Sequence, residues 1–272
     1  MLPWKRLYPK LIEIGSFYLP TYGVLVALGF LAGLAATVKL AKRSGFNSEL
    51  ITNLAVYVAL SGMLGAKLAM IAFDWRDYLA APGRIFSLET LQAAGVFQGG
   101  LILALVTAFF YMKQQGLPFL ATSDAFAPGV AVGHAIGRLG CFAAGCCWGV
   151  ACDLPWAVTF HDPVANGLTG VPLEVALHPT QLYESFAELA LFWWLFSLYK
   201  KPHAPGRIIG LYLVISSLLR FAIEFLRVHQ QGLNLGLSLT QWISVALAVV
   251  GAVLLTRSGS GKPAENTQLA QA

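Results

Sequence analysis

Charged residues are scarce in this sequence. Asp, Glu, Lys and Arg together make up 11% of its 272 residues, whereas a soluble domain carries roughly 25%. Hydrophobic residues make up 57%, and the mean hydropathy is +0.67. So few charged side chains cannot cover a globule that faces water on every side. The composition excludes an ordinary soluble domain and indicates a polytopic membrane protein.

A strong basic surplus and a signal sequence are lacking as well. The formal net charge of +5 is modest and spread over loops. Basic residues distributed in this way indicate the orientation of the chain in a membrane. We expect no nucleic-acid partner. No cleavable signal is apparent, because residues 1–10 mix proline, tryptophan and charge. The apolar run that follows them is long enough to span a bilayer.

Seven apolar segments, each about 20 residues long, match the thickness of a bilayer core. They cover approximately residues 17–38, 50–72, 94–112, 123–142, 179–199, 207–227 and 237–256. The fourth is the weakest, because Pro128 and several glycines interrupt it; a helix broken at membrane depth needs protein or a cavity around it. The sequence predicts an all-α membrane protein with about seven transmembrane helices and a site near the fourth.

Lys and Arg are concentrated in alternate loops, and such loops face the cytoplasm. The loops on one side carry Lys39, Lys42, Arg43, Lys113, Lys200, Lys201, Arg207, Arg257 and Lys262. The segment 143–177 has neither residue type, although the N-terminus departs from the rule with Lys5, Arg6 and Lys10. We therefore expect the N-terminus outside and the C-terminus in the cytoplasm.

One membrane domain over residues 1–257 accounts for these segments. Within it, residues 143–177 form the only large piece that does not span, and their Gly, Pro, Asp and aromatic content predicts a small extracytoplasmic cap between the fourth and fifth spans. Residues 258–272 are polar and predict a disordered cytoplasmic tail.

The fourth span ends in a polar stretch that holds His134 and Arg138. A charge at membrane depth is costly unless a partner or a watery cavity receives it. Arg138 could be an interfacial anchor whose guanidinium reaches the headgroups. It could instead bind phosphate, because the planar guanidinium donates to two phosphate oxygens at once. The sequence is compatible with both roles of Arg138.

The sixth span carries Arg220, Glu224 and Arg227, whose spacing places them on one face of a helix. Three ionisable groups in one span cannot all face lipid. One reading is a structural interhelical ion pair between Arg220 and Glu224. The other is functional: Arg220 supplies a second positive charge to an anionic headgroup, while Glu224 orients it or handles a proton.

Three further stretches are candidates for lining the same cavity. His178 and Pro179 open the fifth span, where proline suits the first turn of a helix. The residues that follow could cap that helix or face the cavity; they include Gln181, Tyr183 and Glu184. Gln98, Gly99 and Gly100 begin the third span and Tyr22 the first, and either could be no more than the start of a helix.

Four cysteines lie close together, at positions 141, 146, 147 and 152. Their spacing matches no strong zinc pattern and contains no Cys-x-x-Cys pair. A disulfide on the oxidising side and simple packing are both compatible with them, and redox or nucleophilic chemistry is a third reading. No metal and no other cofactor is expected.

Taken in order, these stretches resemble the prolipoprotein diacylglyceryl transferase family of the bacterial cytoplasmic (inner) membrane. The matching elements are Tyr22-Gly23, Gln98-Gly99-Gly100-Leu101, Asp124 with Ala127-Pro128, Gly137-Arg138-Leu139-Gly140 with Phe142, Trp148-Gly149, Trp156-Ala157, His178-Pro179-Thr180-Gln181-Leu182-Tyr183-Glu184, and Arg220-Phe221 with Glu224-Phe225 and Arg227. They extend over nearly the whole chain. The stretches that begin at His178 and at Arg220 are the specific ones.

The resemblance implies transfer of the diacylglyceryl group of phosphatidylglycerol to the thiol of a lipobox cysteine in a prolipoprotein signal peptide, with release of glycerol phosphate. The expected partners are therefore phosphatidylglycerol, such signal peptides and membrane lipid. Arg138 and Arg220 would stabilise charge on the departing phosphate, and His134, His178 or Glu224 would take the thiol proton. The substrate-binding residues would be Tyr22, Gln98, Gly99, Gly100, Gln181, Tyr183, Glu184 and Arg227.

Two departures from the family pattern leave alternatives open. The family has a histidine where this chain has Gln98, and a glutamine cannot act as a base at neutral pH. The family's Asn-Phe-x-Asn-x-Glu signature is replaced by the stretch from Cys141 to Cys146. The alternatives are a non-catalytic lipid-binding or transport paralogue, and a membrane thiol oxidoreductase that uses the clustered cysteines.

Overall fold

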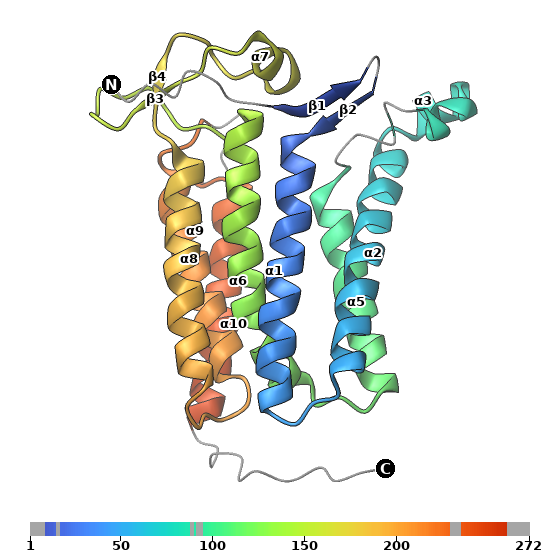
Figure 1. Cartoon of the computed structure of the whole chain (residues 1–272), viewed down its shortest axis with the longest axis vertical. Helices are drawn as coiled ribbons and strands as arrows, with labels where there is room; N and C mark the ends of the chain where they lie inside the picture. Colours follow the sequence, from blue (N-terminus) through green and yellow to red (C-terminus); the bar gives the residue numbers. More distant parts are fainter. Residues whose placement is uncertain (1–8, 15–16, 88–89, 91–94, 229–234, 260–272) are drawn as a thin grey trace. The chain divides into compact units, whose positions relative to one another are not determined.

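The computed structural model describes residues 9–14, 17–87, 90, 95–228 and 235–259, and it is mostly helical (Figure 1). The chain forms two compact units. The first contains residues 1–40 and 123–272, and the second contains residues 41–122. The first unit holds most of the residues singled out above.

The first unit is built on five long helices: α1 (Thr21–Arg43), α6 (Phe119–Ala144), α8 (Thr180–Tyr199), α9 (Arg207–Glu224) and α10 (Leu239–Gly259). Helices α1 and α6 extend a few residues into the second unit. A hairpin of β1 (Lys10–Ile14) and β2 (Phe17–Pro20) precedes α1. Residues 17–20, which we expected inside the first span, therefore form a strand. Lys10 binds Glu13 in this hairpin at 2.7 Å.

The second unit pairs helix α2 (Ser48–Phe73) with helix α5 (Phe97–Gln114), and it also holds α3 (Trp75–Ala80) and the 3₁₀ helix η1 (Pro82–Phe86). Glycines let the two long helices approach closely. A Cβ atom added at Gly65 would lie 2.5 Å from the Gly99 oxygen, and one at Gly100 would lie 2.7 Å from the Gly62 oxygen. Gly99 and Gly100 thus serve helix packing here.

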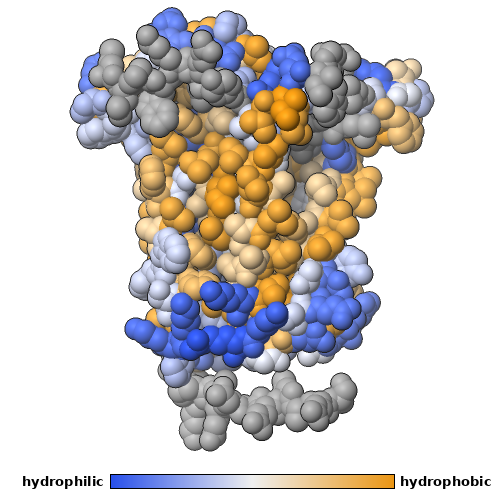
Figure 2. Space-filling view, in the orientation of Figure 1, coloured by the Kyte–Doolittle hydropathy of each residue, from blue (hydrophilic) through white to orange (hydrophobic). Residues whose placement is uncertain are grey.

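The distribution of polar and apolar side chains is that of a membrane protein. Large apolar residues are exposed, such as Phe186 at 66% and Trp193 at 59%, while Gln181 and Glu188 are buried. On the face drawn in Figure 2, hydrophobic side chains cover the middle of the helices and hydrophilic ones gather at the helix ends. Among the described residues, three helices are long and apolar enough to span a membrane: Thr21–Arg43, Ser48–Phe73 and Leu239–Ser258.

Helix α6 is continuous from Phe119 to Ala144 and passes through Pro128 without a break. The prediction that the fourth span is interrupted is therefore wrong. Its glycines belong to a close contact with α1: a Cβ at Gly33 would lie 2.6 Å from the Gly129 oxygen, and one at Gly29 would lie 2.8 Å from the Gly133 oxygen. Small residues of this kind allow two helix backbones to pack tightly in a membrane.

Residues 145–177 form a small folded segment at the end of the first unit where α6 ends and α8 begins (Figure 1). It contains β3 (Val158–Thr159), α7 (Pro163–Thr169) and β4 (Ala176–Leu177), with β3 and β4 antiparallel. Its core is formed by Val158, Phe160, Ala165, Val171 and Leu177. Asp162 caps α7 by accepting a hydrogen bond from the Val164 backbone N–H at 2.8 Å.

The opposite end of this unit is fixed by a buried carboxylate and by basic residues. Asp124 accepts hydrogen bonds from the backbone N–H groups of Gly206 and Ile209 at 2.7 and 2.8 Å, which anchors the start of α9. At the same end, Lys39 and Lys200 both lie over the Phe196 ring. Helix α10 reaches Gly259, and the remaining residues of the predicted tail, 260–272, lie outside the described residues.

Candidate functional site

The polar residues of α6 and α8 face each other. His134, Arg138 and Cys141 follow one face of α6, because residues three and four apart are neighbours on a helix. Helix α8 presents Glu184 and Glu188 four residues apart, and both are buried. The Ser185 hydroxyl donates to the Ala135 carbonyl at 2.8 Å and ties the two helices together at this level.

Glu184 is the centre of an ion-pair cluster. One oxygen, Oε2, lies 2.9 Å from Nη2 of Arg138 and 3.6 Å from Nη1 of Arg220. The other, Oε1, lies 3.2 Å from Nε2 of His134. Only 4% of the Glu184 side chain is exposed, so the guanidinium groups replace the water that the carboxylate has lost.

A second carboxylate completes the surroundings of His134. Glu188 Oε1 lies 3.4 Å from the histidine Nδ1 and also accepts a hydrogen bond from the Ser216 hydroxyl of α9. Because both ring nitrogens face carboxylates, a proton taken up by His134 is stabilised on both sides. Sequence reasoning missed Glu188 and Ser216. A carboxylate one helical turn after Glu184 in an apolar run was the available signal.

Helix α9 contributes the third carboxylate. Arg220 Nη2 lies 2.8 Å from Glu224 Oε2, and Arg227 Nη1 lies 3.8 Å from the same oxygen. The Ser238 hydroxyl donates to the other Glu224 oxygen at 3.1 Å. Helix α9 ends at Glu224, so Arg227 does not share a helical face with the other two as we expected.

Arg227 is placed instead by a backbone bridge to Gly149. The Val150 N–H donates to the Leu226 carbonyl at 2.8 Å, and the Gly149 N–H donates to the His178 carbonyl at 3.0 Å. A Cβ at position 149 would lie 2.6 Å from the Leu226 oxygen, so this crossing requires glycine. The Trp148-Gly149 element therefore joins the folded segment 145–177 to the end of α9.

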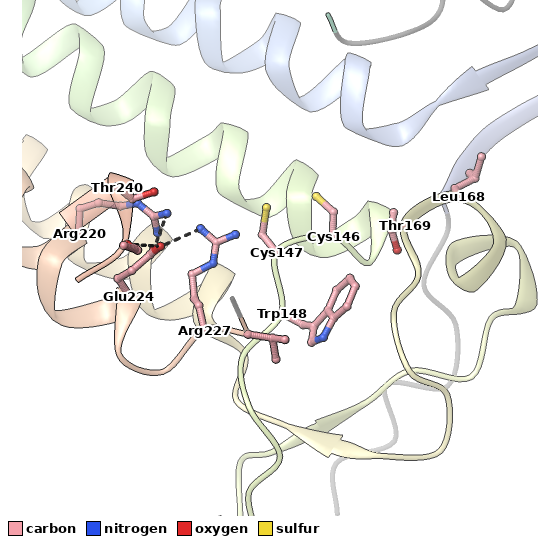
Figure 3. A pocket seen from close by; sticks show the side chains of 11 residues that line it. Cys146, Cys147, Trp148, Leu168, Thr169, Arg220, Glu224, Arg227 and Thr240 are labelled. Carbon is pink, nitrogen blue, oxygen red and sulfur yellow. Dashed lines mark hydrogen bonds and ion pairs between the residues drawn. The ribbon is translucent and has the colours of Figure 1, made fainter. Parts of the chain in front are cut away.

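A cavity of about 440 Å³ opens beside these groups (Figure 3). It is lined by Cys146, Cys147, Trp148, Leu168, Thr169, Arg220, Glu224, Arg227, Val228, Ser238 and Thr240. In Figure 3 the Arg227 guanidinium lies between the Glu224 carboxylate and Cys147. The cavity thus has positive charge, a carboxylate and thiols on its wall.

Some N–H donors of the cluster make no hydrogen bond. Nε of Arg138 and Nη1 of Arg220 are buried and have no hydrogen-bond partner among the described residues. Arg138 nevertheless contacts Glu184 through Nη2. Arg220 Nη1 itself lies at ion-pair distance from Glu184. Buried donors of this kind are costly unless a ligand uses them, and the oxygens of a phosphodiester suit them.

The turn after α6 is held by the start of α8. Thr180 Oγ1 donates to the Cys147 carbonyl at 2.8 Å, and Gln181 Nε2 donates to the Cys146 carbonyl at 2.6 Å. Cys147 has a φ of 62°, in the left-handed region that side chains rarely adopt. Such a conformation costs on the order of 1–3 kcal/mol and needs surrounding structure to persist. Gln181 therefore positions the turn that carries Cys146 and Cys147, which we call the thiol turn.

All four cysteines are free thiols, and three of them are gathered together. The sulfur atoms of Cys141, Cys146 and Cys147 lie within 4.8 Å of one another. Hydrogen bonds from the Cys141 and Cys146 thiols, together with the charges of Arg227 and Arg138, lower the pKa of Cys147. Hydrogen bonds to its two neighbours in the cluster raise the pKa of Cys146.

The other predicted residues of the first unit are His178, Tyr183 and Tyr22. His178 Nδ1 is 3.2 Å from the Tyr183 hydroxyl, which accepts a hydrogen bond from Trp156 Nε1 at 2.8 Å. These contacts join Trp156 of the folded segment 145–177 to the start of α8. Tyr22 packs its ring against Gly140, where a Cβ would lie 3.2 Å from the ring.

Gln98 lies in the first turn of α5, in the second unit. Gly99 and Gly100 follow it and pack against α2, as described above. These three residues therefore belong to the second unit, whereas the residues of the ion-pair cluster belong to the first.

Comparison with known proteins identifies the family. A family model described as "Prolipoprotein diacylglyceryl transferase" matches residues 9–257. The chain is 33% identical over 244 residues to the phosphatidylglycerol–prolipoprotein diacylglyceryl transferase of Clostridium tetani, covering 89% of this chain and 94% of that protein. It is 35% identical over 269 residues to the enzyme of that name from Methylobacillus flagellatus, covering 94% and 98%. This chain therefore belongs to the prolipoprotein diacylglyceryl transferase family.

Proposed function

We propose that this chain transfers the diacylglyceryl group of phosphatidylglycerol to the thiol of the lipobox cysteine of a prolipoprotein and releases glycerol phosphate. The relatives carry the name of that activity. The observation that carries the proposal is a pair of arginines, Arg138 and Arg220, that share the Glu184 carboxylate. Each has a buried N–H donor without a hydrogen-bond partner among the described residues, and Arg220 lines the cavity. A phosphodiester would use these donors.

The reaction is an alkylation of sulfur. A thiolate attacks the glyceryl carbon, the bond from that carbon to the phosphate oxygen breaks, and the oxygen leaves with the electron pair. Arg138 and Arg220 stabilise the negative charge that grows on this oxygen. Arg227 extends the positive wall of the cavity, while Glu184 and Glu224 hold the guanidinium groups in place.

The proton of the acceptor thiol needs a destination, because thiolate is the nucleophile. His134 is one candidate, because the carboxylates at both its ring nitrogens would stabilise the proton that a neutral imidazole takes up. Glu224, which lines the cavity, and His178, which lies with Tyr183, are the other candidates. Tyr22, whose ring packs against Gly140 of α6, would contribute to positioning the lipid headgroup.

The same proposal covers the membrane topology. Residues 1–257 form a membrane domain in the bacterial inner membrane, with seven spans formed by α1, α2, α5, α6, α8, α9 and α10, and residues 143–177 as an extracytoplasmic cap. The N-terminus lies outside and the C-terminus in the cytoplasm. Lys39 and Lys200 support this orientation, because both lie at the end of the first unit opposite the cap.

The test is transfer of labelled diacylglycerol from phosphatidylglycerol to a lipobox peptide by the purified protein. We expect thioether product from the wild type and a loss on the order of 10²–10³ in rate for Arg138→Ala and for Arg220→Ala. Arg257→Ala, an exposed arginine at the far end of α10, is the matched control and should keep the wild-type rate. Phosphatidylglycerol binding without any product would contradict the proposal.

The same assay addresses the non-catalytic alternative, for which Gln98 is the best support. A large gain in transfer for Gln98→His would indicate a site that has lost its base. No gain would indicate that this chain activates the thiol by other means. The thiol oxidoreductase alternative is not favoured, because the relatives are named as transferases over nearly the full chain.

A further inference from the structure

The three gathered thiols form a potential metal site that the sequence spacing did not reveal. Cys141 lies on the last turns of α6, and the Cys146 N–H returns to its carbonyl at 3.0 Å. The left-handed conformation of Cys147 then turns the third side chain back toward the other two. All three sulfurs lie within 4.8 Å of one another, and Cys146 and Cys147 line the cavity.

Zinc fits this donor set. Zinc–sulfur bonds of about 2.3 Å place the sulfurs of a tetrahedral site about 3.8 Å apart. The sulfurs seen here would draw together by at most about 1 Å, which small rotations of cysteine side chains provide. Calcium and magnesium prefer oxygen ligands and are excluded by three thiols. Three protein ligands with a fourth position open to a substrate are the arrangement of catalytic zinc sites.

The charges around the thiols suit a zinc site as well. A zinc ion with three thiolates carries a net charge of −1, and a fourth thiolate makes it −2. Arg138 Nη1 already donates to Cys141 Sγ at 3.6 Å, and Arg227 lies beside Cys147 on the cavity wall (Figure 3). These two guanidinium groups balance the charge that the complete site would carry.

We propose that Cys141, Cys146 and Cys147 bind one zinc ion whose fourth coordination position takes the acceptor cysteine of the prolipoprotein as a thiolate. This inference rests on the proposed function, because it assigns the activation of the acceptor thiol to the same cavity. A thiol that coordinates zinc is deprotonated at neutral pH. The site would thereby supply the thiolate for which a general base is otherwise needed.

The step balances. The peptide thiol replaces a water on the zinc ion and releases its proton to solvent or to a base of the cluster. The zinc-bound sulfur then attacks the glyceryl carbon, the carbon–oxygen bond breaks, and glycerol phosphate leaves with the electron pair. The resulting thioether is a weak ligand, so it leaves and water returns. The oxidation state of sulfur and zinc does not change.

The first experiment measures the metal itself. Protein purified without chelator is assayed for zinc by mass spectrometry, and protein reloaded with Co²⁺ is examined for a sulfur-to-cobalt charge-transfer band. We expect one metal ion per chain and a thiolate band, both lost in Cys141→Ser, Cys146→Ser and Cys147→Ser. Cys152→Ser is the matched control, because Cys152 lies outside the cluster. It should keep both signals.

The second experiment adds the substrate. A lipobox peptide should strengthen the thiolate band of the cobalt protein, and the same peptide with serine for cysteine should not. Chelation should lower transfer on the order of 10²-fold, as expected for loss of a base, and added zinc should restore it. These two signals do not require the cysteine variants to fold.

The outcomes separate the two proposals. Undiminished transfer by metal-free protein would overturn the zinc site and leave the transferase standing. Metal binding with peptide coordination but no thioether product would overturn the transferase and uphold the zinc site. Metal binding that the peptide does not perturb would overturn the role of zinc in activating the acceptor thiol.

Discussion

At the scale of single residues, one carboxylate organises the site. Glu184 contacts Arg138, Arg220 and His134 at once, and it is almost fully buried. Without it, two guanidinium groups would face each other in a medium that screens charge poorly. Arg138 and Arg220 therefore depend on α8 for their positions, although they come from α6 and α9.

The first prediction concerns this carboxylate. Glu184→Gln keeps the shape of the side chain and removes its charge, which leaves buried guanidinium groups without their shared partner. Removing one member of a buried ion pair costs on the order of 3–5 kcal/mol. We expect a clearly lower melting temperature in detergent and at least about tenfold slower transfer.

Its control is the same substitution at an exposed ion pair. Glu174 lies 2.6 Å from His161, and its side chain is 72% exposed. Exposed ion pairs contribute at most about 1 kcal/mol to folding stability. Glu174→Gln should therefore leave the melting temperature and the transfer rate unchanged. Equal behaviour of the two variants would show that Glu184 does not hold the arginines.

Single residues also show what sequence reasoning could reach. Arg138, Arg220 and Glu224 were predicted because charge in an apolar run needs a partner. Glu188 met the same criterion and was overlooked. The thiol cluster could not be found, because it depends on the left-handed backbone at Cys147 and on the hydrogen bonds from α8, neither of which leaves a spacing pattern.

At the scale of elements, long apolar helices were predictable from hydropathy, while the continuity of α6 through Pro128 was not. Glycines in one sequence look the same whether they interrupt a helix or pack it. A comparison of two spans could have indicated the packing role: Gly29 and Gly33 in the first span have the same four-residue spacing as Gly129 and Gly133 in the fourth. The structure brings these two pairs together.

The second prediction tests this packing. In Gly33→Ala the added Cβ would lie 2.6 Å from the backbone oxygen of Gly129. Backbone cannot move aside as a flexible side chain does, so α1 and α6 must separate. Overpacking of this kind costs about 1–3 kcal/mol, and we expect the melting temperature to fall.

The matched control is the same change on α6. A Cβ at Gly137 meets no described atom within 4 Å. Gly137→Ala should therefore have the melting temperature of the wild type. A melting temperature for Gly33→Ala that equals that of Gly137→Ala would show that α1 and α6 do not depend on glycine contact.

At the scale of the whole molecule, composition determined the class of protein correctly. A chain with 11% charged residues exposes many large apolar side chains and buries the carboxylates of Asp124, Glu184, Glu188 and Glu224, the reverse of a soluble protein. The hairpin before α1 was not predicted, since strands outside a hydrophobic core leave little pattern. The division into two compact units follows from contacts and not from composition.

The last prediction concerns the orientation of the chain in the membrane. Within the first unit, the thiol turn, the cavity and residues 145–177 lie at one end, and the basic residues Lys39 and Lys200 lie at the other. Because basic loops stay in the cytoplasm, the cavity should open toward the outer face, where the acceptor cysteine of an exported prolipoprotein would arrive. Green fluorescent protein fused after Ala272 should fluoresce, and alkaline phosphatase inserted after Gly170 should be active. An active phosphatase at the C-terminus would place the cavity on the cytoplasmic side instead, and an acceptor that reaches its enzyme only after export could not then be the substrate.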